Sequence, residues 1–269
     1  MKSRMIVTTL LVALCAVACA AQSAPAQGAV PEDPGAKKAR AILDRMIQAM
    51  GGEAFLTYAD MTQQGRAAAF YHGTPSGTST PYWLFWKWPD MERVEVSKQR
   101  DIVYIHNGDK GYEVTYKGTR AQDPEDHKEY ERNRQYALQV VLRRWLKQPG
   151  TTLFYEGVGV VDQKQVDKIT VLNANNQSVT FSIDAYTHLL VRKSYQWREP
   201  DTRFFDQEEE AYGNYHLVQG IQTPRSLVTM HNGDVTRQRF VDVTSYNNGL
   251  ADSMFQTTIT YDPLEKKKK

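Results

Sequence analysis

Apolar and polar positions alternate along most of the chain after residue 60, as they do in half-buried β-strands. This pattern predicts strands at 61–72, 82–88, 92–97, 102–106, 111–116, 153–161, 166–172, 179–183, 189–197, 204–215, 225–231 and 235–246. Segments rich in Asn and Gly, which tolerate the positive φ of tight hairpins, separate several strands, as at 107–109, 175–176 and 232–234. We therefore predict an antiparallel, meandering sheet.

The alternation is cleanest in the second half of the chain. Val179, Phe181 and Ile183 share one face of their strand. In the next strand one face is predicted to carry Leu189, Val191, Tyr195 and Trp197, and the other Leu190, Arg192, Ser194 and Gln196. The pattern indicates a sheet that is apolar on one side.

The stretch PYWLFWKWP, residues 81–89, departs from this alternation because it is apolar on both faces. Tyr82, Leu84 and Trp86 should point one way, and Trp83, Phe85 and Lys87 the other. One face should pack on other layers of the domain, and the second should line a lipid-sized cavity or form an exposed contact surface. A strand that is buried on both faces is the alternative, and the pattern alone leaves both open.

Two segments have helical spacing. Residues 36–50 carry apolar side chains at helical intervals and end at Gly51-Gly52. Asp123 and Pro124 begin a second helix, predicted to run unbroken to Lys147. Its apolar stripe comprises Tyr130, Ala137, Leu138, Val141, Leu142, Trp145 and Leu146.

A sheet of about a dozen long strands tends to curl. With two helices to place, we predict a mainly β (α+β) fold: a curved, incompletely closed antiparallel β-barrel whose concave face the helices cover. Trp145 and Leu142 should pack into that face.

The N-terminal residues resemble an export signal, and the C-terminal residues form a basic tail. Residues 1–20 have a basic start, an apolar run and Ala18-Cys19-Ala20, which predicts a secretory signal peptide. Cleavage after Ala20 would release a soluble periplasmic protein, which we favour, whereas cleavage before Cys19 would give an acylated outer-membrane lipoprotein. We assign 21–34 to a flexible leader, 35–262 to the folded domain and 263–269 to a basic tail.

Charge and motifs exclude several functions. Without Lys2 and Arg4, 31 basic residues face 31 acidic ones, which gives no reason to bind nucleic acid. The sequence has no Gly-x-Ser-x-Gly or His-Glu-x-x-His motif, so we expect no enzyme, no metal site and no cofactor. Strand alternation places Glu208 and Glu210 on one face, where they could bind a hard cation or act as a carboxylate pair, but a solvated strand edge is the expected explanation.

Motifs in a particular order carry a family resemblance that spans most of the chain after residue 40. They are Ile42-Leu43-Asp44 with Gly51-Gly52, Phe85-Trp86-Lys87-Trp88-Pro89-Asp90 with Arg93, Asn107-Gly108-Asp109-Lys110-Gly111-Tyr112, Ile183-Asp184 with Thr187 and Leu189, Tyr212 and Tyr215 with Gly220-Ile221-Gln222-Thr223-Pro224, and Asn247 and Asn248 with Leu250 and Phe255. In these motifs the chain resembles the periplasmic lipoprotein-localisation carriers (LolA and LolB) and related outer membrane lipoprotein-sorting proteins.

The resemblance implies an unclosed barrel that holds acyl chains of lipids or lipoproteins, and possible carriage between membranes, with no catalytic residue. Candidate lipid-binding residues are Tyr82, Leu84, Trp86, Val94, Leu138, Val141, Leu142, Trp145, Phe181, Leu189 and Val191. We expect a monomer whose partners are these acyl chains and envelope membrane proteins. The alternative is an envelope interaction module without lipid cargo, in which the protein's own side chains would fill the concave interior.

Overall fold

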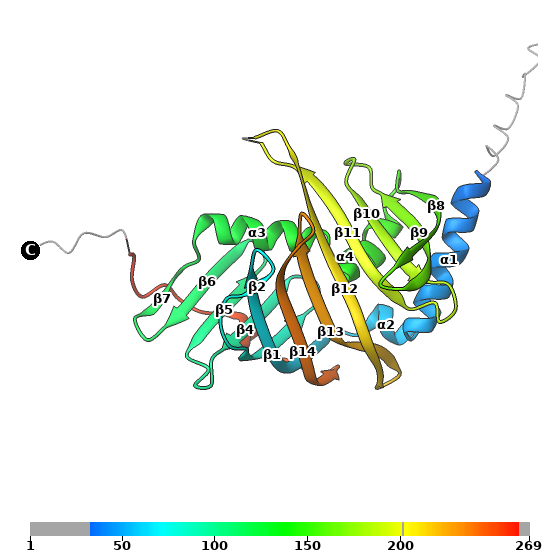
Figure 1. The fold of residues 1–269 in the computed structure, drawn as a ribbon. Helices are drawn as coiled ribbons and strands as arrows, with labels where there is room; N and C mark the ends of the chain where they lie inside the picture. Colours follow the sequence, from blue (N-terminus) through cyan, green and yellow to red (C-terminus); the bar gives the residue numbers. More distant parts are fainter. Residues whose placement is uncertain (1–32, 201, 264–269) are drawn as a thin grey trace, which may run out of the picture. The chain divides into compact units, whose positions relative to one another are not determined.

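The strands form one antiparallel sheet in which nearly all neighbours in sequence are neighbours in space. The computed structural model describes residues 33–200 and 202–263. Within them fourteen strands join in the order β7-β6-β5-β4-β3-β1-β14-β13-β12-β11-β10-β9-β8, with β2 paired to β1. Of these strands, the two at the ends, β7 and β8, do not pair, so the sheet is curved but not closed (Figure 1), as predicted. The assignments for residues 1–20, most of 21–34 and 264–269 lie outside the described part of the chain.

The chain forms one meander of strands before a helical segment and a second meander after it. The strands are β1 (Asp60–Tyr71), β2 (Thr74–Pro75), β3 (Thr80–Lys87), β4 (Met91–Val96), β5 (Ile102–Asn107), β6 (Lys110–Thr115), β7 (Gly118–Ala121), β8 (Thr152–Val161), β9 (Lys164–Leu172), β10 (Ser178–Asp184), β11 (Leu190–Arg198), β12 (Phe205–Val218), β13 (Ile221–His231) and β14 (Asp234–Tyr246). The helices are α1 (Pro34–Met50), α2 (Glu53–Thr57), α3 (Pro124–Gln135) and α4 (Leu138–Arg143), with 3-10 turns η1 (Trp145–Lys147) and η2 (Asp252–Phe255).

Strands β1 and β14 join the two meanders, although they stand at opposite ends of the sequence. Their register shifts between Gln64 and Gly65, so Gly65 lies opposite Val241. A Cβ atom at Gly65 would be only 2.0 Å from the carbonyl oxygen of Phe240, which explains why this position has no side chain. The junction makes one continuous sheet out of two hairpin series.

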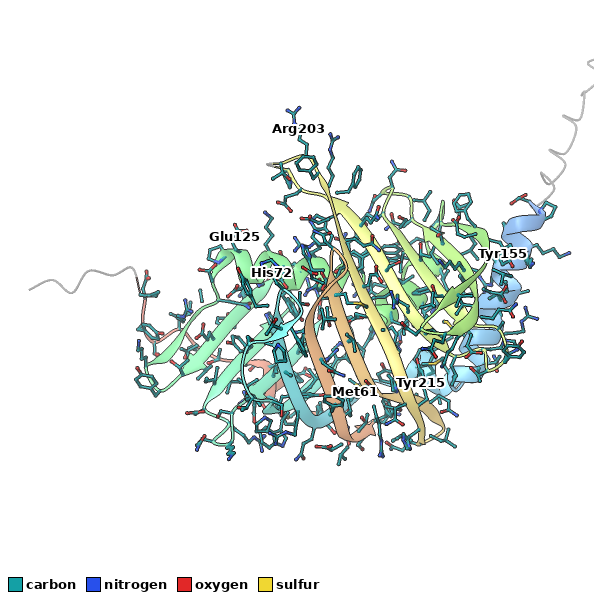
Figure 2. All side chains as sticks on the ribbon, in the orientation of Figure 1. Met61, His72, Glu125, Tyr155, Arg203 and Tyr215 are labelled. Carbon is teal, nitrogen blue, oxygen red and sulfur yellow. The ribbon has the colours of Figure 1, made fainter. Side chains whose placement is uncertain are left out.

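The core of the second meander is filled by α1 and α4. Apolar residues of α1 recur at helical spacing, and Ala39, Leu43 and Met46 have no exposed surface. They pack in one cluster with β9, β10 and β11 residues, which include Ile169, Val171, Val179, Phe181, Ile183, Leu190 and Tyr195. Tyr155 of β8 lies beside α1 (Figure 2), and the Lys38 ammonium is 3.8 Å from its ring centroid.

The segment between β7 and β8 differs from the prediction because it is not one unbroken helix. Ala137 has an extended backbone conformation, φ −61° and ψ 141°, which separates α3 from α4. Tyr136 stands at this break and is buried, with its ring stacked on Tyr195 at a centroid distance of 4.1 Å. The break allows α4 to enter the core, where Leu142 and the following Trp145 are buried as expected, while α3 buries none of its residues.

A second correction concerns the two faces of β11. The register of β10 against β11 shifts so that Ser182 faces Arg192 but Ile183 faces Leu190, which leaves Val191 as an extra residue. Leu190, and not Leu189 or Val191, therefore shares the inner face with Tyr195. A bulge reverses the alternation, and the sequence pattern does not reveal where it falls.

The outer face of β3 is covered by the C-terminal part of the chain. Phe85 packs in a small cluster with Val103, Ile105 and Phe255. The Lys87 ammonium donates a hydrogen bond of 2.7 Å to the carbonyl oxygen of Leu250 and pairs with Asp252. The outer face of the PYWLFWKWP strand is thus covered by protein, whereas its inner face borders a cavity.

Candidate functional site

A cavity of about 680 Å³ lies on the inner face of the sheet. Its wall combines residues of β1, β3, β4, β12, β13 and β14 with residues of α2, α3 and α4. This volume falls within the range of roughly 300–1,000 Å³ that is typical of small-molecule sites in proteins. The cavity is thus large enough for a ligand of moderate size.

One wall of the cavity is apolar and comes mainly from β3 and β4. Tyr82, Leu84 and Trp86 point into it from alternate positions of β3, and Val94 faces it from β4. Leu138, at the start of α4, lines it from the helical layer. Burial raises the pKa of Tyr82, whose hydroxyl donates a hydrogen bond of 3.1 Å to Gln63 Oε1. These five predicted residues are brought together as one surface.

The other six predicted residues do not line this cavity. Val141, Leu142 and Phe181 are at most 3% exposed and belong to the filled core, against which Leu189 packs. Val191 is buried at the β11 bulge. Trp145 is also in the core and borders a second cavity of about 690 Å³, which is lined mostly by polar and charged residues. Most of these residues are buried because α1 and α4 pack directly against β9, β10 and β11 and leave no cavity between helices and sheet.

The opposite part of the cavity is strongly polar. Lys193 of β11 and Glu210 of β12 are cross-strand neighbours, and their charged atoms are 2.7 Å apart. Arg239 of β14 lies 4.0 Å from the same carboxylate, and the Tyr212 hydroxyl donates a hydrogen bond of 2.6 Å to it. Burial alone would raise the pKa of Glu210, but Lys193 and Arg239 lower it to about 2. Glu210 is therefore ionised at neutral pH.

The acidic run 208–210 is not the solvated strand edge that we expected. Strand β12 lies between β11 and β13, and Glu208 and Glu210 share a face, as alternation predicted, but that face is the inner one. Each carboxylate has its own partner, since Glu208 is 3.2 Å from His231 Nδ1 and Glu210 is bound to Lys193. In residues 33–200 and 202–263 no group of three metal-ligating side chains is found. Of the three glutamates, Glu210 forms part of the polar wall of the cavity.

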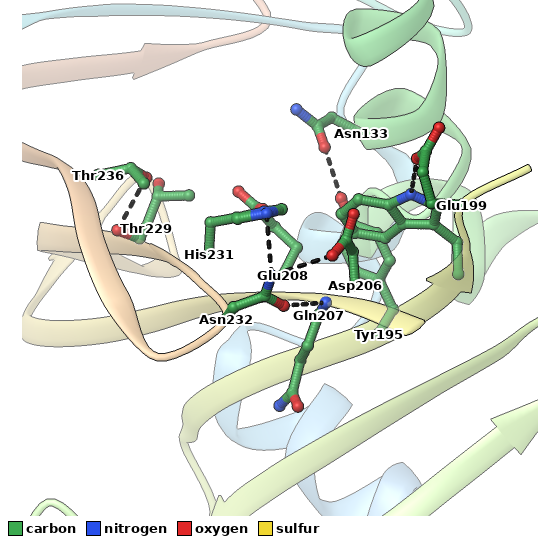
Figure 3. A network of polar contacts seen from close by, with 11 residues as sticks. Asn133, Tyr195, Glu199, Asp206, Gln207, Glu208, Thr229, His231, Asn232 and Thr236 are labelled. Carbon is green, nitrogen blue, oxygen red and sulfur yellow. Dashed lines mark hydrogen bonds and ion pairs between the residues drawn. The ribbon is translucent and has the colours of Figure 1, made fainter. Parts of the chain in front are cut away.

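Helix α3 bridges the two meanders above this wall. At one end Tyr130 stacks on His106 of β5, and Arg134 donates a hydrogen bond to the carbonyl oxygen of Gly108. On the other side the Tyr195 hydroxyl of β11 donates a hydrogen bond to Asn133 (Figure 3). Because α3 has polar contacts and no buried residue, it covers the inner face without filling it.

The contact between α3 and β5 depends on a neutral imidazole. His106 is 3% exposed, and burial lowers its pKa to about 4. Its Nε2 is 2.8 Å from Gln122 Oε1, whereas its Nδ1 is 4.0 Å from Glu92 and has no hydrogen-bond partner. Burial also raises the pKa of Glu92, although Arg239 and Arg237 oppose this effect. The cavity thus holds several ionisable groups with shifted pKa values.

The sequence analysis missed the basic residues of this site. Lys193, Arg237 and Arg239 line the cavity, and none of them was a candidate. Arg237 and Arg239 alternate in a strand, and this spacing shows only that they share a face. Pairing of Arg239 with Leu227 and Ala67, both on the cavity wall, decides that this face is the inner one.

The fold matches solved structures at low sequence identity. The chain is similar to a DUF1329 family protein from Desulfovibrio piger, with a TM-score of 0.56 and 11% identity over 82% of this chain and 97% of that one. It is also similar to a domain described as an outer membrane lipoprotein-sorting protein from Vibrio parahaemolyticus, with a TM-score of 0.52, 8% identity and coverage of 82% and 97%. A LolA superfamily protein from Nitrosomonas europaea gives a TM-score of 0.50, 10% identity and coverage of 81% and 97%.

These similarities confirm the fold that the sequence motifs implied, an incompletely closed antiparallel barrel. No family model matches the sequence, and no curated protein does. In the described residues, no helix has both the length and the apolar character needed to span a membrane.

Proposed function

We propose that this protein is exported to the bacterial envelope, where it binds acyl chains of lipids or lipoproteins in the cavity and carries them between membranes. One observation carries the proposal: Tyr82, Leu84, Trp86, Val94 and Leu138 form an apolar wall beside empty space. Apolar surface of this kind gains roughly 25 cal/mol per Å² when a ligand removes it from water. The similarity in fold to a lipoprotein-sorting domain supports the same function.

The signal at 1–20 supports export, and a soluble periplasmic protein that begins at Ala21 is the form we favour. An outer-membrane form anchored through Cys19 is the alternative. Intact-mass measurement of the protein from its own envelope separates the two, because only the second carries a diacylated Cys19. Envelope membrane proteins are the proposed partners for loading and release.

Leu84→Glu and Phe85→Glu form a matched pair, because the two residues are adjacent and face opposite sides of β3. We expect Leu84→Glu to abolish binding of a fluorescent fatty acid while the protein still folds, since the new carboxylate has free space beside it. Phe85→Glu should instead lower the unfolding midpoint and leave binding intact below that temperature. The several kcal/mol needed to desolvate a carboxylate explain both effects.

Thermal unfolding and fluorescence titration of both variants test the proposal. Equal loss of folding in both variants would mean that the β3 aromatics are ordinary core. Absence of fatty-acid binding by the unmodified protein would refute acyl binding itself and would favour an interaction module without lipid cargo.

A further inference from the structure

The polar part of the cavity contains an arginine that has no close partner among the described residues. Lys193 and Arg239 both contact Glu210, at 2.7 Å and 4.0 Å, so one carboxylate already has two cations. Arg237, on the same face of β14, makes no side-chain hydrogen bond and no ion pair within 4.0 Å of any described residue. Its side chain is exposed, and Glu210, Glu92 and Glu129 act on its charge only at longer range.

A second observation shows an unmet need for an acceptor at the same place. Arg239 Nε is buried and has no hydrogen-bond partner. Buried N–H groups of this kind are nearly always paired, because an unpaired one has lost its hydrogen bonds to water without replacement. A ligand oxygen between Arg237 and Arg239 would supply that acceptor.

Acidic groups also face the cavity. Glu92 lines it from β4, and it forms no ion pair within 4.0 Å with Arg237 or Arg239 among the described residues. Asp126 and Glu129 face it from α3, and neither forms an ion pair with Arg237 or Arg239 among the described residues. Arg134 of the same helix adds a further cation. The basic residues on the sheet thus remain available to an anion.

The apolar and basic parts lie at different levels along the strands. Pairing places Arg239 opposite Ala67, whereas Trp86 and Tyr246 both pair with Met61, near the other end of β1. Arg239 and Tyr246 are seven positions apart on β14, which corresponds to roughly 20 Å along the strand. Half of a bilayer's hydrocarbon core is about 15 Å thick, so the span suits one acyl chain with its head group.

We propose that the ligand is an anionic amphiphile whose head-group carboxylate or phosphate is bound by Arg237 and Arg239, with its acyl chain along Leu84 and Trp86. This inference rests on the proposed acyl binding and adds the charge and orientation of the ligand. Arginine pairs suit carboxylate and phosphate oxygens because their N–H groups form two parallel hydrogen bonds.

The experiment compares three probes of equal chain length below their micelle concentrations: an ionised fatty acid, the fatty alcohol and the alkyl trimethylammonium salt. In calorimetric titrations we expect the acid to bind roughly tenfold more tightly than the alcohol, or more, because hydrogen bonds between charged groups are stronger than those of a neutral hydroxyl. The ammonium salt should bind no better than the alcohol. A lysophospholipid with an anionic head group, compared with its zwitterionic analogue, then distinguishes phosphate from carboxylate ligands.

Arg237→Gln should abolish the preference for the acid and leave the affinity for the alcohol unchanged, whereas Arg237→Lys should retain part of the preference. Arg66→Gln is the matched control, because Arg66 lies on the neighbouring strand β1 next to Ala67 and points to the opposite face. It should change neither affinity.

Equal affinity of the unmodified protein for acid and alcohol would overturn the inference and leave the proposed acyl binding standing. Equal weakening of both probes by Arg237→Gln would also overturn it, because Arg237 would then support the cavity and not select charge. If no probe binds, the proposed function and the inference both fail.

Discussion

The two halves of the sheet use their inner faces in different ways. On β9, β10 and β11 the protein's own side chains fill the space, and Ile169, Phe181 and Leu190 have no exposed surface. On β3, β4 and β14 the inner face borders the cavity of about 680 Å³. The sheet is continuous, so the strands themselves do not explain the difference.

The covering helices explain it. Helices α1 and α4 present apolar stripes whose residues are almost completely buried, whereas α3 is held by polar contacts at His106, Gly108 and Tyr195 and buries none of its residues. The apolar stripe of a helix must be buried against other apolar residues, whereas a polar helix can lie over an open space. The cavity therefore results from the polar helix α3 and the contacts that hold it, and not from the sheet.

The largest effect is expected on the free energy of unfolding when one leucine is substituted in each half of the sheet. Leu190→Ala should lower the free energy of unfolding by about 2–5 kcal/mol, because it leaves a void in a closed core. Leu84→Ala should cost under about 2 kcal/mol, since the Leu84 side chain already borders empty space and has fewer neighbours to lose. Urea denaturation of both variants measures the difference, and equal losses would show that the open half is packed as tightly as the closed one.

A smaller effect is expected when side chains are enlarged. Ala39 of α1 is fully buried, so Ala39→Leu should destabilise the protein by about 1–3 kcal/mol through overpacking. Ala67 of β1 lines the cavity, and Ala67→Leu should leave the unfolding midpoint nearly unchanged while it reduces acyl binding. The denaturation midpoint and a ligand titration are measured on the same samples. A large destabilisation by Ala67→Leu would mean that the cavity has no room for three more carbon atoms.

The most gradual effect concerns pH and the attachment of α3. The pKa of His106 falls from 6.5 to about 4 in the folded protein, so folding favours its neutral form. The stability that this group contributes is complete above pH 6.5 and is lost as pH falls toward 4, by on the order of 1 kcal/mol per pH unit. Gln122, His127, Glu92 and Arg134 are the polar groups that act on it.

We expect the hydrogen-exchange protection factors of α3 to fall over that pH range while those of α1 do not. His106→Gln should remove the difference between the two helices. Parallel loss of protection in α1 and α3 would show that acid destabilises the whole fold and that His106 does not specifically hold α3 in place.

Much of the sheet was predictable from local patterns in both halves. The pattern of side chains on β3 and the hairpin turns at 107–109, 175–176 and 232–234 followed from alternation and from residues that accept positive φ. The helix break at Tyr136 was not predictable, because Tyr136 and Ala137 are compatible with a helix and only the stacking of Tyr136 on Tyr195 favours the break.

By itself the sequence determined the antiparallel meander, the two helical stripes and the apolar character of Tyr82, Leu84 and Trp86, because each depends on residues that are close in the chain. Only the tertiary structure decided which faces turn inward and what lies on them. The bulge at Val191 placed Leu190 in the core, and the pairing of β14 with β1 placed Arg237 and Arg239 in the cavity. Alternation sorts side chains into two faces but does not say which is the inner one, and long-range pairing and bulges settle that.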